Sequence, residues 1–179
     1  MSAVPAVFLD RDGVVVVPEF RDGRSYAPTT IDAFRLYPDI EEPLRQLKAR
    51  GYRIVVVTNQ PDVGRGVIAA ATLAEMHARM TQALPVDEVR VCTHTRADAC
   101  DCRKPRPGML LDAARDAGIA LADSFMIGDR DSDVAAGRAA GCRTIFIDLG
   151  YTAEPAPDQP DWTVASLQQA IAIILSQRP

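Results

Sequence analysis

Five short apolar runs, rich in β-branched residues, recur along the chain and are separated by segments with helical periodicity. The runs are residues 4–9, 53–57, 88–92, 124–127 and 143–147. Hydrophobicity is continuous rather than alternating in most of these runs, which is typical of strands that helices cover on both faces. Strands that alternate with helices in this way predict an α/β fold with a doubly wound parallel sheet.

The segments between the runs have the spacing and the end signals of amphipathic helices. Helices are expected at residues 40–50, 70–84, 107–118, 131–140 and 166–177, and a short further strand at 162–164. Gly51 and Gly118 suit helix ends, and Pro107 suits a helix start. Residues 15–30 are the one long irregular stretch, and they form either a flap over a site or a loose loop. No linker divides the chain, so residues 1–179 are expected to form a single domain without a large cap.

The composition excludes several classes of protein. The chain has 179 residues, of which 47% are apolar and 25% charged, as expected of a globular domain. Its formal net charge of −4 argues against a broad basic face for nucleic acid. No apolar run is long enough to cross a bilayer, and too few residues precede Ala3 for a signal peptide. We therefore expect a cytoplasmic monomer without nucleic-acid or membrane partners.

Three of the four cysteines and one of the two histidines lie in a C-x-H-x5-C-x-C motif. Its members are Cys92, His94, Cys100 and Cys102, and they provide the soft ligand set of a tetrahedral zinc site. In a reducing compartment such a cluster favours a metal over disulfides, and a metal-free loop of thiols is the alternative. Four protein ligands leave no open position for water, so the zinc at residues 92–102 is expected to be structural. Cys142 stands apart among small residues, and a core position is expected for it.

Carboxylates follow two of the predicted strands. Asp10 and Asp12 come after the first strand, and Asp129 comes after the fourth. Right-handed crossovers bring the carboxyl ends of parallel strands to one edge of the sheet, where such sheets bind ligands. Carboxylates gathered there attract a hard cation such as Mg²⁺, although Asp and Gly residues are also common in solvated turns.

Groups suited to an anionic ligand follow other predicted strands. Thr58, Asn59 and Gln60 offer a hydroxyl and backbone N–H groups after the second strand, and Lys104 offers a charge for a phosphate. Each signal is weak alone, because such residues are common on protein surfaces, but their order on successive strand ends is harder to obtain by chance. His77 has no partner in the sequence, and a surface or half-buried position is expected for it.

Together, these motifs resemble the haloacid dehalogenase superfamily of aspartate-dependent phosphatases. The matching segments are D-R-D-G at 10–13, V-V-T-N-Q at 56–60, R-K-P at 103–105 and G-D-R-x-x-D at 128–133. The cysteine motif is similar to that of the zinc-containing branch with heptose bisphosphate and histidinol-phosphate phosphatases. The resemblance implies a Rossmann-like core and Mg²⁺-dependent hydrolysis of a small sugar phosphate, with a heptose bisphosphate preferred and histidinol phosphate as the alternative. A non-catalytic zinc-bearing binding module on the same fold is the alternative from another class.

The resemblance also implies roles for individual residues. Asp10 would be the nucleophile and Asp12 the general acid and base, and Thr58 and Lys104 would stabilise the phosphoryl oxygens. Mg²⁺ would be held by the Asp10 carboxylate, the Asp12 carbonyl and Asp129, with Asp133 orienting a metal-bound water or Lys104. The expected substrate contacts are Asn59, Gln60, Arg103 and Arg130. A solvated edge is the alternative for the two arginines.

Overall fold

The structure is a computed structural model that describes residues 3–177, and its centre is a parallel sheet of six strands. The spatial order is β5-β4-β1-β6-β7-β8, and every neighbouring pair runs parallel. The strands are β1 (Ala6–Leu9), β4 (Arg53–Asn59), β5 (Glu88–Cys92), β6 (Phe125–Gly128), β7 (Arg143–Ile147) and β8 (Trp162–Val164). The predicted α/β fold with a doubly wound parallel sheet is confirmed, and all six predicted strands are present within a few residues.

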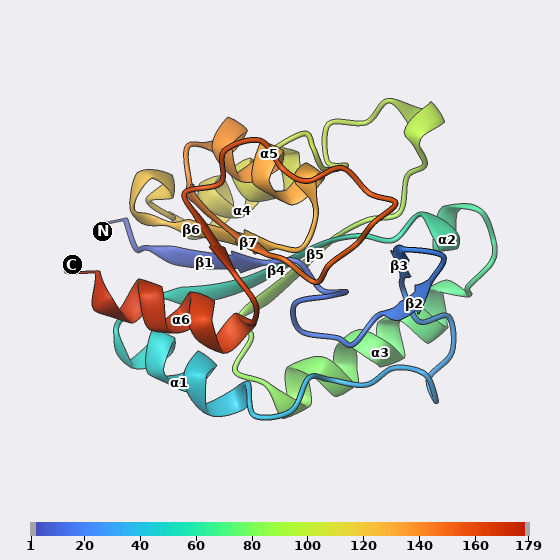
Figure 1. Cartoon of the computed structure of the whole chain (residues 1–179), viewed down its shortest axis with the longest axis horizontal. Coiled ribbons are helices and arrows are strands. Elements are labelled where there is room, and N and C mark those ends of the chain that lie inside the picture. The colour runs from blue at the N-terminus through green and yellow to red at the C-terminus, as the bar shows by residue number, and fades with distance from the viewer. Residues whose placement is uncertain (1–2, 178–179) are drawn as a thin grey trace.

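Helices cover both faces of this sheet (Figure 1). One face packs against α1 (Glu41–Ala49), α3 (Ala70–Ala83) and α6 (Leu167–Ser176), and the other against α4 (Gly108–Ala117) and α5 (Asp131–Ala140). Successive side chains of a strand point to opposite faces. In β1, Val7 and Leu9 therefore join the first core, whereas Ala6 and Phe8 join the second.

The stretch at residues 15–30, which the sequence analysis treated as irregular, contains regular structure. An antiparallel hairpin of β2 (Glu19–Arg21) and β3 (Arg24–Tyr26) lies within it. Only Ser25 of the hairpin strands is buried, so the apolar pattern that predicts a strand is absent. Three short helical turns were also not predicted: α2 (Pro61–Gly64), η1 (Arg96–Asp98) and η2 (Leu121–Asp123).

The topology brings the carboxyl ends of β1, β4 and β6 side by side. β1 lies inside the sheet between β4 and β6. From β1 the strand order proceeds through β4 to β5 on one side and through β6 to β7 and β8 on the other. The residues after Leu9, Asn59 and Gly128 therefore meet at one edge. No large cap domain covers this edge in the part of the chain that the structure describes. Within residues 3–177, no helix is long and apolar enough to cross a membrane.

Candidate active site and metal centres

Three carboxylates converge at the carboxyl edge of the sheet. Asp10 follows β1, Asp129 follows β6, and Asp133 lies in the first turn of α5. One oxygen from each lies within 4.8 Å of the others, and all three residues are buried. Burial, together with the charges of Asp10 and Asp133, raises the pKa of Asp129 well above its ordinary value. Burial also raises the pKa of Asp133 to about 6, against the opposing charge of Lys104.

Lys104 compensates much of this negative charge. Its Nζ lies 2.6 Å from Asp10 Oδ1 and 2.7 Å from Asp133 Oδ1, and it donates to the Val57 carbonyl at 2.7 Å. Burial alone would lower the pKa of Lys104, but the two carboxylates raise it, so the ammonium stays charged. Asn59 fixes the backbone here, because its side chain accepts from Lys104 N at 3.1 Å and donates to Lys104 O at 3.0 Å.

The Asp12 carboxylate lies outside this cluster and is held by different groups. Arg11 Nε and Nη2 each donate to one Asp12 oxygen at 3.0 Å, and Gln60 Nε2 donates to Oδ2 at 2.7 Å. Gln60 Nε2 also lies 2.9 Å from Thr58 Oγ1, so it joins the ends of β1 and β4. Burial raises the pKa of Asp12, and the Arg11 charge opposes this. Arg11 and Gln60 therefore hold the Asp12 carboxyl group in a fixed orientation at the cleft.

One atom of the acidic cluster suits a cation in particular. Asp129 Oδ1 is buried and has no hydrogen-bond partner among the described residues, whereas Oδ2 accepts from the Tyr151 hydroxyl at 2.6 Å. Gly13, at φ +93°, makes room for this arrangement, because a Cβ there would lie 2.0 Å from Asp129 Oδ2. Three neighbouring carboxylates with one unsatisfied oxygen fit a hard divalent ion such as Mg²⁺. The Asp12 carboxylate would not be a ligand in this geometry, which leaves its carbonyl as the predicted contribution.

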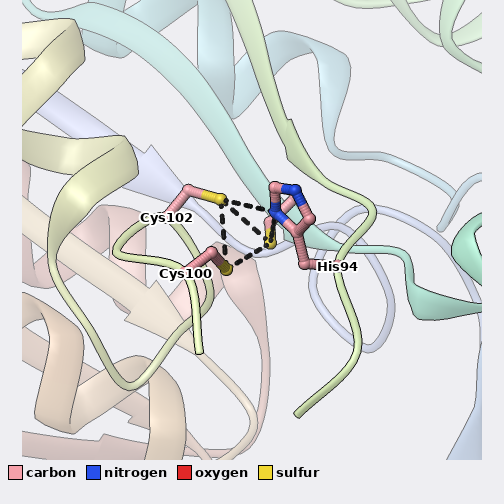
Figure 2. A group of neighbouring side chains, drawn as sticks. His94, Cys100 and Cys102 are labelled. Atoms are coloured by element: carbon pink, nitrogen blue, oxygen red, sulfur yellow. Dashed lines mark hydrogen bonds between the residues drawn. The ribbon is translucent and has the colours of Figure 1, made fainter. Parts of the chain in front are cut away.

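The cysteine motif folds into a second compact cluster at the end of β5 (Figure 2). Cys102 Sγ lies 3.1 Å from Cys92 Sγ and 3.5 Å from Cys100 Sγ, and His94 Nδ1 lies 3.3 Å from Cys102 Sγ. Ligands on a zinc tetrahedron with Zn–S bonds of about 2.3 Å are separated by roughly 3.5–3.8 Å. The four groups therefore form a near-tetrahedral set that could hold zinc, with Nδ1 as the imidazole ligand.

A large cleft opens in front of the acidic cluster. It has a volume of about 1070 Å³, and Asp10, Asp12, Lys104 and Asp133 all line it. Six arginines also line it: Arg24, Arg65, Arg96, Arg103, Arg106 and Arg130. Carboxylates line its walls as well, and Arg65 and Arg130 pair with two of them, Asp62 and Glu154. The guanidinium groups nevertheless suit an anionic ligand larger than inorganic phosphate.

The four residues predicted to contact the substrate differ in whether their side chains are available to a ligand in the cleft. Arg103 is half-buried, donates to the His94 carbonyl at 3.1 Å and lines the cleft. Arg130 Nη2 donates to Ser25 O at 2.7 Å and Ser25 Oγ at 2.6 Å, so it holds the hairpin. Asn59 lines the cleft, but Gln60 is 1% exposed and contacts Asp12 and Thr58 instead. Substrate contacts by these four residues stay predictions.

The sequence analysis missed two supporting side chains and one contact. Arg11 is fully buried, which nothing in its D-R-D-G context indicates, and Tyr151 lies in a loop with no motif. His77 is half-buried as predicted, but it has a partner, because its Nε2 lies 3.2 Å from Arg11 Nη1. Burial and then the Arg11 charge lower the pKa of His77 to about 4. These contacts join residues far apart in sequence, and no local pattern signals them.

Comparison with known proteins places this geometry in a family. A family profile described as HAD-hydrolase-like matches residues 101–170. A D-glycero-beta-D-manno-heptose-1,7-bisphosphate 7-phosphatase from Rhodopseudomonas palustris is 39% identical over 76% of this chain and 79% of its own length. The protein of the same name from Salmonella typhi is 35% identical over 99% of this chain and 98% of its own length.

Solved structures agree with these relatives. The D,D-heptose 1,7-bisphosphate phosphatase from B. bronchiseptica, complexed with magnesium and phosphate, superimposes with a TM-score of 0.82 at 29% identity. That match covers 96% of this chain and 98% of the other. The chain therefore belongs to the haloacid dehalogenase-like hydrolase family, as a phosphatase that hydrolyses phosphoric monoesters. Within that family, the similar relatives at 35–39% identity are heptose bisphosphate 7-phosphatases.

Proposed function

We propose that this chain hydrolyses the 7-phosphate of D-glycero-D-manno-heptose 1,7-bisphosphate and releases heptose 1-phosphate. The observation that carries the proposal is the convergence of Asp10, Lys104, Asp129 and Asp133 at the carboxyl edge of the sheet. The names of the relatives at 35–39% identity support the choice of sugar. The arginine-lined cleft supports a substrate with a second anionic group, because guanidinium groups bind phosphate well.

The reaction proceeds in two displacements at phosphorus. In the first, an Asp10 oxygen forms a bond to phosphorus as the bond to the sugar oxygen breaks, and Asp12 gives its proton to that leaving oxygen. In the second, a water attacks the aspartyl-phosphate and gives a proton to Asp12, which restores both carboxyl groups and releases phosphate. Asp12 is suited to both steps, because burial raises its pKa while Arg11 and Gln60 hold it at the cleft.

Positive charge on the cleft floor makes the attack of one anion on another feasible. Lys104 lies between Asp10 and Asp133, where its ammonium can also meet an equatorial phosphoryl oxygen. Thr58 would offer its hydroxyl from the end of β4. Asp10, Asp129 and the Asp12 carbonyl would hold Mg²⁺, which, when bound, supplies charge neutralisation at the transferring phosphoryl group. Asp133 orients Lys104 and accepts from Arg130 N at 3.1 Å.

The cysteine cluster is proposed as a structural zinc site. Its four ligands leave no coordination position for a substrate. Its last ligand, Cys102, is followed directly by Arg103 and Lys104. A zinc ion held by Cys92, His94, Cys100 and Cys102 would therefore fix the loop that aims both cations into the cleft.

Phosphate release from defined substrates tests the proposal. With Mg²⁺ and zinc-loaded protein, kcat/KM for heptose 1,7-bisphosphate should exceed that for histidinol phosphate, and ³¹P NMR should show that the anomeric phosphate is retained. Asp10→Asn should be inactive on every ester. A preference for histidinol phosphate, or loss of the anomeric phosphate, would contradict the proposed substrate. Neither result would contradict the role of Asp10 as the nucleophile.

The cysteines also support a proposal for the cellular setting. A zinc site of three thiolates requires reduced cysteines, and the four cysteines are free in the structure. This supports action in a reducing compartment such as the cytoplasm. We propose further that the chain acts there as a monomer on a small sugar phosphate, without nucleic-acid or membrane partners. Heptose 1-phosphate would then feed the synthesis of nucleotide-activated heptose for the lipopolysaccharide core.

A further inference from the structure

A tyrosine outside the predicted motifs touches the proposed metal site. Tyr151 lies beyond β7, and its hydroxyl donates to Asp129 Oδ2 at 2.6 Å. Burial raises the pKa of Tyr151, and the negative charge of Asp129 raises it further. The contact geometry makes the phenolic O–H the donor and Asp129 Oδ2 the acceptor.

The two oxygens of Asp129 have different surroundings because of this bond. Oδ2 has a partner, whereas Oδ1 is buried and has none among the described residues. An unsatisfied buried carboxylate oxygen is costly, and it persists where a ligand can satisfy it. One oxygen of Asp10 and one of Asp133 lie within 4.8 Å of an Asp129 oxygen. The hydrogen bond thus fixes the plane of the Asp129 carboxylate and leaves one oxygen for a cation.

The Tyr151 ring is itself held by two other elements. It stacks on Phe20 of the hairpin, with ring centroids 5.9 Å apart and planes 21° from parallel. Gly13 lies close to the hydroxyl end of the ring, since a Cβ at that position would lie 3.1 Å from the Tyr151 hydroxyl. The adjacent loop also joins the hairpin, because Ala153 N donates to Gly23 O at 3.1 Å. The phenol has little freedom to leave Asp129.

We infer that Tyr151 is a positioning residue for the metal ligand Asp129, and that the hairpin residue Phe20 supports it. The inference rests on the proposed magnesium site at Asp10 and Asp129. It differs from a structural role in one measurable way. Removal of the phenolic hydroxyl should weaken Mg²⁺ binding while the fold and the zinc site stay unchanged. Partners of this kind typically account for a 10–100-fold change in metal affinity.

The test is metal binding by the full-length, zinc-loaded chain. Calorimetric titration with Mg²⁺, and electron paramagnetic resonance titration with Mn²⁺, should show about 10-fold or greater weakening in Tyr151→Phe. Tyr52→Phe is the matched control, because Tyr52 packs on Phe125 with centroids 6.2 Å apart, away from the acidic cluster. It should bind Mg²⁺ as the wild type does. Zinc content and the melting temperature without Mg²⁺ should be equal in all three proteins.

Other outcomes separate the inference from the proposed site. Equal Mg²⁺ affinity in Tyr151→Phe and wild type, or an equal loss in Tyr52→Phe, would overturn the role of Tyr151 and leave the site intact. Wild-type affinity in Asp129→Asn would overturn the magnesium site, and the inference with it. Phe20→Leu is a second variant at a residue that is 57% exposed and safe to change. It should weaken Mg²⁺ binding about threefold, and unchanged affinity there would remove the hairpin from the inference.

Discussion

The two clusters that could hold metals are built in opposite ways. The cysteine cluster uses residues 92–102, has only Cys92 buried, and takes its four ligands from one strand end and the loop after it. The acidic cluster spans residues 10–133, is buried throughout, and takes its members from two strand ends and a helix start. One cluster follows from local spacing, and the other exists only once the sheet has formed.

The two clusters should also have opposite effects on stability: the cysteine cluster should stabilise the fold when it binds a metal, whereas the acidic cluster should destabilise it. A metal ion that binds the cysteines displaces their remaining protons, and its binding free energy then adds to folding. Three buried carboxylates repel one another, and Lys104 alone contacts two of them. We expect the cysteine cluster to act on stability and the acidic cluster to act on turnover, and the following experiments compare them directly.

The largest effect is expected at the nucleophile. Asp10→Asn should lower kcat by about a thousandfold or more, because an amide oxygen does not form the covalent intermediate. Melting should show an intact fold, and zinc content should be unchanged. Asp131→Asn is the matched control, since Asp131 lines the cleft but lies outside the acidic cluster. Near-normal turnover by Asp10→Asn would end the proposed mechanism.

Removal of the buried Lys104 ammonium should lower the stability of the protein in a pH-dependent way. Lys104→Met leaves the carboxylates of Asp10 and Asp133 uncompensated, which should cost about 3–5 kcal/mol of unfolding free energy at pH 8. The Lys104 charge opposes the upward shift of the Asp133 pKa, so without it that pKa rises further in the folded state, and this loss should shrink as the pH falls to 5. Urea unfolding at both pH values measures it. A pH-independent loss would show that packing, rather than charge, is the cause.

At the other cluster, Cys100→Ser should lower zinc content and the unfolding free energy, by about 2–4 kcal/mol. Turnover should fall indirectly, because without zinc the loop that carries Arg103 and Lys104 is no longer held in place. Cys142→Ser is the matched control, because Cys142 is a buried free cysteine that is not a member of the Cys92–Cys102 ligand group. Stoichiometric zinc in Cys100→Ser, with melting equal to wild type, would remove the zinc assignment and with it the contrast between the clusters.

The smallest effect is expected at His77, which contacts Arg11 next to the acidic edge of the sheet. The folded pKa of His77, about 4, lies below its unfolded value of 6.5, so the unfolded chain binds the extra proton first as the pH falls. The contribution of His77 is complete above pH 6.5 and is lost as the pH falls towards 4. After allowance for solvent screening, wild type should lose about 1 kcal/mol more than His77→Gln between pH 7 and 5. Parallel pH dependence in urea unfolding would contradict this.

Much of the fold and part of the site could be predicted from the sequence. Each long strand and helix was predicted within a few residues, because burial on both faces leaves continuous apolar runs and helical stripes in the chain. The clustering of the cysteine motif was predicted for a similar reason, since Cys92 and Cys102 are close in sequence as well as in space. The hairpin at Glu19–Tyr26 was missed, because its exposed strands have no apolar pattern and pair through backbone hydrogen bonds.

The sequence by itself determined the strand and helix order, the cysteine ligand set and the acids at the strand ends, because each depends on residue type and short spacing. Tertiary structure decided which acids meet: Asp133 joins Asp10 and Asp129, while the Asp12 side chain pairs with Arg11. It also decided that Tyr151 bonds to one Asp129 oxygen and leaves the other free. The physical reason is that local pattern reports burial and periodicity, whereas the contacts between charges depend on sheet order and crossover handedness.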